Sequence, residues 1–142
     1  MRLPESAIPA IAFRFEGLHG RQIGPDELAE IKEHDIEDVD PELLARELRH
    51  LIDSESKADG RDRGQAYWAL GKKLDRALLP FFREKLRLEL CRDMFSAYQI
   101  LIALDDLGEQ PFGSDGSGYS SDDYDLNRRD AEAYLDRVGV PV

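Results

Sequence analysis

The stretch that decides the fold is Gln65-Ala66-Tyr67-Trp68-Ala69-Leu70, which aligns with Gln99-Ile100-Leu101-Ile102-Ala103-Leu104 at a constant offset of 34 residues. A repeat period of roughly 20–50 residues is typical of proteins built from stacked helix pairs. Such proteins mostly present a surface to a partner. The repeat therefore favours a binding function over catalysis.

Helix start and stop signals continue the pattern on both sides of the repeat. Pro25 and Pro41 are followed by acidic residues, which is typical of a first helical turn. Asp75 and Asp93 are placed to cap the helices that follow them, and Gly108 occupies a natural C-cap position. These signals predict a chain of consecutive helices with no sheet.

The chain divides into four parts of one helical domain. Residues 1–24 contain two prolines and three glycines, and they predict an irregular N-terminal arm, with a short strand at 11–15 or a short helix as alternatives. Residues 25–108 form the predicted helical core, 109–125 a Gly/Ser/Asp loop and 126–138 a C-terminal helix. The expected fold is an all-α, compact domain of five or six helices.

Three segments of the core alternate in character, namely residues 66–71, 75–86 and 100–108. Helices rich in alanine and leucine alternate with an Asp-led helix that carries Pro80 near its start. This alternation resembles HEAT-like helical repeats over roughly residues 64–108, about a third of the chain. The resemblance implies an αα-hairpin core and a role as a scaffold or binding surface.

Charge is distributed unevenly along the chain, whose net charge is −11. Residues 1–25 carry +1, residues 26–62 carry −9, residues 63–104 carry +4 and residues 105–142 carry −7. Nucleic acid is disfavoured as a partner, because binding it requires lysine and arginine against the phosphates. A basic protein would be attracted, and it would associate faster at low salt.

Acids and tyrosines alternate near the end of the core and in the loop that follows, as is typical of interface anchors. The predicted partner-binding residues are Asp105, Asp106, Glu109, Tyr119, Asp122, Asp123, Tyr124 and Asp125. The predicted function is non-catalytic protein–protein binding through an acidic surface. A concrete version is an immunity protein that neutralises a basic toxin; an adaptor or regulatory subunit fits the same pattern.

Two alternatives remain open at this point. A small-ligand site or an enzyme active site could lie between helices near Trp68, with Tyr67 and Tyr98 lining it, although all three also suit a core. The basic residues of the middle segment pair either with acids of the same chain or with a second copy, which would give a homodimer. The seven in question are Lys72, Lys73, Arg76, Arg83, Lys85, Arg87 and Arg92.

No metal, cofactor or catalytic motif is expected. Residues 113–124 match only the middle of a calcium-binding EF-hand loop, because Gly113 and Tyr124 stand where carboxylates are required. Cys91 is the single cysteine, which excludes an internal disulfide and suits a reducing compartment. Without a membrane-length apolar run or a secretory signal, the expected location is the cytoplasm.

Overall fold

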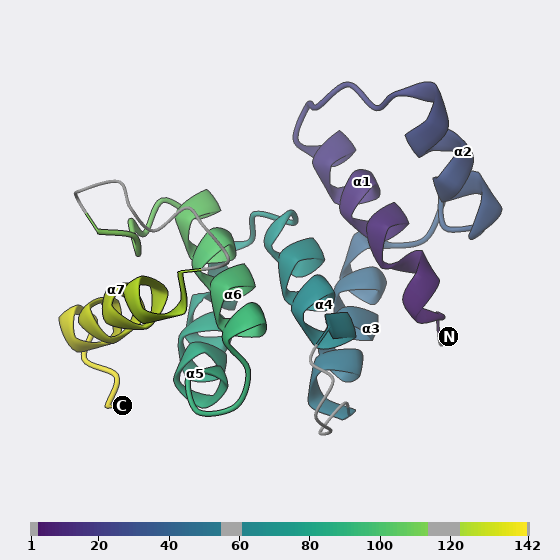
Figure 1. Cartoon of the computed structure of the whole chain (residues 1–142). Coiled ribbons are helices and arrows are strands. Elements are labelled where there is room, and N and C mark those ends of the chain that lie inside the picture. Colours follow the sequence, from purple (N-terminus) through teal and green to yellow (C-terminus); the bar gives the residue numbers. More distant parts are fainter. Residues whose placement is uncertain (1–2, 55–60, 114–122, 142) are drawn as a thin grey trace.

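The structure, a computed structural model, describes residues 3–54, 61–113 and 123–141 (Figure 1). Regular structure within these ranges is entirely helical, which confirms the all-α prediction. The elements in chain order are η1 (Glu5–Ala7), α1 (Ile8–Leu18), α2 (Pro25–Glu33), α3 (Pro41–Ser54), α4 (Arg61–Gly71), η2 (Arg76–Leu78), α5 (Leu79–Glu89), α6 (Met94–Asp106) and α7 (Tyr124–Arg137), the η elements being short 3-10 helices.

The prediction of an irregular N-terminal arm is wrong, because α1 forms there, and the described residues hold seven α-helices rather than five or six. Pro9 does not prevent this helix, because it lies in the first turn, where its missing amide hydrogen would have no partner within the helix. Ile11 and Phe15 are fully or almost fully buried. The short-helix alternative for this segment was therefore correct.

The helices follow one another across the molecule from the N-terminal α1 and α2 to the C-terminal α7 (Figure 1). α4 occupies the centre and packs against α1, α3 and α6. α5 packs against α6, and α7 covers α5 and α6. The predicted C-terminal helix at 126–138 is thus observed as α7, which starts two residues earlier.

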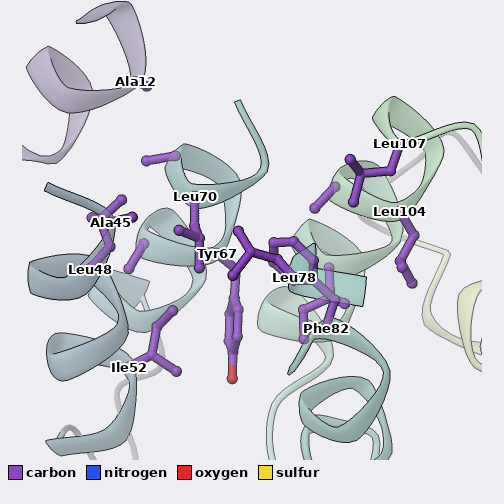
Figure 2. Packing of buried hydrophobic residues seen from close by; sticks show 14 of the residues in the cluster. Ala12, Ala45, Leu48, Ile52, Tyr67, Leu70, Leu78, Phe82, Leu104 and Leu107 are labelled. Carbon is purple, nitrogen blue, oxygen red and sulfur yellow. The ribbon is translucent and has the colours of Figure 1, made fainter. Parts of the chain in front are cut away.

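A continuous apolar core runs along both sides of α4. Figure 2 shows Tyr67 and Leu70 of α4 between Ile52 of α3 on one side and Phe82 of α5 on the other. All four side chains are at most 2% exposed. Because α4 contributes to both halves, its buried side chains belong to one apolar cluster that includes the N-terminal and the C-terminal helices.

α4 and α6 approach each other through small residues. A Cβ atom added at Gly64 would lie 3.4 Å from Ser96 Oγ, and one added at Gly71 would lie 2.7 Å from Ala103 Cβ. Gly71 lies seven residues after Gly64 in α4, and Ala103 lies seven residues after Ser96 in α6. The two helices therefore run parallel. The two copies of the sequence repeat are thus neighbouring parallel helices.

The local cap signals behave as expected. The Asp75 side chain accepts a hydrogen bond from the Ala77 amide, and the Asp93 side chain accepts one from the Ser96 amide. Gly108 follows α6 with a φ of 83°, a left-handed conformation that suits glycine. These ends could be predicted because each depends on residues only a few positions apart.

Candidate functional site

The predicted acidic residues of the α6 end are largely neutralised within the chain. Glu109 accepts hydrogen bonds from Arg83 and from the Tyr134 hydroxyl, and these bonds hold the pKa of Glu109 below its ordinary value. Asp106 pairs with Lys72 at 3.1 Å. Burial, followed by the nearby charge of Asp106, raises the pKa of Asp105.

The other described members of the predicted partner-binding set lie at the N-terminal end of α7, whereas Tyr134, which binds Glu109, lies near its C-terminal end. Asp123 caps this helix through the Leu126 amide, and Asp125 and Tyr124 are exposed in its first turn. Nine residues separate Asp125 from Tyr134, which corresponds to about 14 Å along a helix. The described members of the predicted set thus lie toward the two ends of α7, and the role of the set in binding stays a prediction. Tyr119, Asp122 and the centre of the calcium-like loop lie outside the described residues.

The basic residues of the middle segment pair with acids of the same chain. This pairing is one of the two alternatives that the sequence left open. Each of the seven predicted cations has a carboxylate partner between 2.5 and 3.3 Å away. The pairs are Lys72–Asp106, Lys73–Glu42, Arg76–Glu109, Arg83–Glu109, Lys85–Asp53, Arg87–Glu84 and Arg92–Glu89. The positive charge of this segment is therefore used internally.

Six acids outside such pairs lie on α2 and the turn that follows it, and exposed acids without an ion pair among the described residues also occur on α7, namely Asp125, Glu132 and Asp136. We call the first six the α2 acidic surface. Its members are Asp26, Glu30, Glu33, Asp35, Glu37 and Asp38. All are exposed except Glu30, which is partly exposed, and none forms an ion pair within the described part of the chain. Lys32 is the single basic residue between positions 22 and 45.

The surroundings of the α2 acidic surface are held in place by polar contacts. Arg14 of α1 donates from Nε to the Glu37 carbonyl oxygen at 3.0 Å and from Nη2 to the Val39 carbonyl oxygen at 2.9 Å. At the start of α2, Glu27 accepts a hydrogen bond from the Gly24 amide and pairs with Arg21 at 2.8 Å. The turn after α2 is thus fixed to α1, and its acids point outward from a rigid support.

A buried ionic cluster lies at the junction of α4, α5 and α6. Glu89 is fully buried and accepts hydrogen bonds from Arg63 Nε at 2.7 Å, from the Tyr67 hydroxyl at 2.8 Å and from Arg92 Nη2 at 2.7 Å. Burial alone would raise the pKa of Glu89, but the bonds from Arg92, Arg63 and Tyr67 together lower it. The cluster fixes three helix ends, and sequence reasoning missed it because no local signal connects residues 26 positions apart.

This cluster predicts a stability that depends on pH. Because the pKa of Glu89 is lower in the folded than in the unfolded chain, its carboxylate stabilises the fold above the unfolded value, and this contribution is lost as the pH falls through the folded value. Urea unfolding of the wild type and of Glu89→Gln should differ most at neutral pH, and the gap should shrink toward about pH 3. A gap that stays constant over this range would contradict the account.

The alternative site near Trp68 gains no support from the surface hollows that the described residues form. Tyr67 is fully buried, with its hydroxyl on Glu89. Trp68 lies under the ammonium of Lys72, and the Tyr98 ring lies 6.1 Å from that of Phe112. None of the three aromatic residues lines the three hollows that lie beside η1 and α3, beside Leu74 and beside Cys91 in the described part of the chain. Each of them instead has a packing role.

Two structural features are absent from the described residues. Within the described ranges, no group of three or more His, Cys, Asp or Glu side chains is arranged to hold a metal ion. No helix in those ranges combines the length and apolar character that a membrane span requires. No protein-family model matches the sequence, and neither a curated protein nor a solved structure matches the chain.

Proposed function

We propose that this chain is a non-catalytic binding protein whose α2 acidic surface takes a basic protein partner. The observation that carries the proposal is the imbalance of charge after internal pairing. All seven cations of the middle segment have acidic partners in the chain, whereas the acids of the α2 acidic surface have none among the described residues. Surplus charge of one sign on a rigid support favours fast capture of an oppositely charged protein.

A basic toxin is the kind of partner that we place first. A small acidic protein can neutralise a cationic enzyme by occupying its positive cleft, and attraction between the two surfaces speeds the encounter. The proposal includes the cytoplasmic location that is expected from the sequence. Lysate of the source cells is therefore where the partner should be sought.

We also propose that the centre of the domain is a HEAT-like pair of helical hairpins. The parallel arrangement of α4 and α6, with α5 between them in the chain, supports this proposal. Small residues at the closest points, Gly71 and Ala103, let the two helices stack. In such an arrangement, neighbouring units support one another and leave their outer faces for partners.

The test of the binding proposal is a pair of charge-reversed variants with equal net charge. Glu33→Lys/Asp38→Lys should reduce capture of a basic partner from lysate at least about tenfold, because it converts attraction into repulsion at the contact. Glu132→Lys/Asp136→Lys reverses two exposed acids on α7 and should retain capture. Equal losses in the two variants would show that only net charge matters and would contradict a local site.

A third variant tests the surface predicted from sequence. Tyr124→Ala/Asp125→Ala removes two exposed residues of the first turn of α7 and leaves the capping residue Asp123 in place. We expect its capture of the same partner to match that of the wild type. Loss of capture in this variant alone would place the partner-binding site on α7, as predicted from the sequence.

A further inference from the structure

A groove of about 140 Å³ lies where η1 and the start of α1 meet the C-terminal half of α3. Ile8 and Ile11 of α1 and Leu48 and Leu51 of α3 contribute apolar lining. Each pair is three residues apart, so its two members share one face of their helix. Ile8, Ile11 and Leu48 are buried and Leu51 is partly exposed, so the groove has an apolar floor beneath a solvent-accessible opening.

Two acids stand beside this floor. Glu5 is exposed and Glu47 is partly exposed, and both line the groove. Neither forms an ion pair with any described residue, and no lysine or arginine belongs to the described lining. The described lining, which also includes His50, therefore combines an apolar base with two carboxylates that have no lysine or arginine partner among the described residues. The α6 end differs, because Glu109 pairs there with Arg76 and Arg83.

We propose that this groove takes one arginine or lysine side chain of the basic partner. The methylene stem would lie on the apolar floor, and the cationic head would pair with Glu5 and Glu47. Long cationic side chains have both features, because their stems cover apolar surface while their charged ends stay near water. This inference rests on the proposed function and names a contact that would give it selectivity.

The apolar floor is essential to the argument. An exposed ion pair contributes little by itself, and two surface carboxylates would attract any cation without preference. Contact between the stem and Leu51 adds a requirement for length and apolar character. The groove should therefore bind a complete arginine side chain more tightly than it binds the guanidinium group alone or the apolar stem alone.

Three small probes test this distinction on the complete, isotope-labelled chain. N-acetyl-arginine amide carries both stem and charge, guanidinium carries only the charge, and N-acetyl-norleucine amide carries only the stem. Titration followed by amide chemical shifts should show the arginine probe perturbing residues 5–11 and 47–54. Its affinity should exceed that of either fragment by at least about tenfold.

Conservative variants provide the matched control. Glu5→Gln/Glu47→Gln should weaken the arginine probe about tenfold or more, because both counter-charges are lost while the shape is kept. Glu132→Gln/Asp136→Asn makes the same change in charge at two exposed acids of α7 and should leave that affinity unchanged. Far-ultraviolet circular dichroism would verify that both variants fold.

The outcomes separate this inference from the proposed function. Equal binding of arginine and guanidinium, or no perturbation at the groove, would overturn the groove assignment. In either case capture of a basic partner could still depend on Glu33 and Asp38, and the proposed function would stand. If arginine binds in the groove but charge reversal at those two residues leaves partner capture intact, the α2 site is wrong instead.

Discussion

Replacing Glu89 by alanine is expected to lower the free energy of unfolding by about 3–5 kcal/mol, the usual cost of breaking a buried ion pair by removing one partner. The side chain of Arg63 is 1% exposed, and its guanidinium would lose its nearer carboxylate, at 2.7 Å, and keep the more distant one of Asp93, at 3.7 Å. The Tyr67 hydroxyl would lose its acceptor at the same time. Urea unfolding followed by circular dichroism measures the change.

The same helix provides a matched control. Glu84 also pairs with an arginine three residues later, Arg87, in the same two-bond geometry that joins Glu89 to Arg92. The Glu84 side chain is 54% exposed, so Glu84→Ala should change stability little. If the two alanine variants unfold at the same urea concentration, burial of the Glu89 cluster is not what makes it important.

A second control separates the charge from the packing. Substituting both partners with apolar residues of similar size, as in Arg63→Met/Glu89→Met, removes the buried charges together. Such double replacements are often far less costly than removing one partner. The double variant should therefore be more stable than Glu89→Ala. A double variant that is less stable than Glu89→Ala would contradict the electrostatic explanation.

The second large effect is expected at Gly71, where alanine should destabilise the fold by about 1–3 kcal/mol. An added Cβ would lie 2.7 Å from Ala103 Cβ and 3.0 Å from Ala103 Cα, so the backbone of α6 would have to move. In an unconstrained helix the same change would be favourable, because alanine forms helices better than glycine. The sign of the measured change therefore reports the closeness of the two helices.

Two further variants make this test specific. At Gly64 an added Cβ would meet the Phe95 ring at 2.5 Å, but that ring is only partly buried and can turn away. Gly64→Ala should therefore cost less than Gly71→Ala. Ala103→Gly, added to Gly71→Ala, removes the closer of the two contacts but keeps the one with the Ala103 Cα. Because a glycine inside α6 also costs about 1 kcal/mol, the double variant should recover only part of the lost stability. A Gly71→Ala variant as stable as the wild type would contradict the close parallel packing of α4 and α6.

Local features of this fold could be predicted from the sequence because they depend on near neighbours. The caps Asp75, Asp93 and Gly108 were identified correctly for that reason. The N-terminal helix was only an alternative to an irregular arm, because Pro9 and Gly17 indicated interruptions. Burial of the apolar residues of α1 against the rest of the domain outweighs these weak local signals.

The packing register of the repeat was also beyond sequence reasoning. The repeat aligns residues 34 positions apart, whereas the closest approach places Gly71 beside Ala103, 32 positions away. Sequence alignment identifies equivalent positions, but side-chain size decides which positions touch. The buried partnership of Arg63 and Glu89 was missed for the same reason, since it is a contact between distant positions.

The candidate site, too, could be predicted from the sequence only in part. Segment charges predicted an acidic protein with a basic middle, and they already showed that residues 26–62 are the most acidic part. Sequence could not show which acids are neutralised by folding. Lys72, Arg76 and Arg83 neutralise Asp106 and Glu109, whereas the acids of the α2 acidic surface have no ion-pair partner among the described residues.

The most direct test of the central claim is an amide hydrogen-exchange map of the complex with the basic partner captured at low salt. Our account predicts added protection in residues 25–39, where the α2 acidic surface lies, with a second protected region at residues 5–11 and 47–54. Protection confined to α5, α6 and α7 would contradict it, because binding would then leave the α2 acidic surface uncovered.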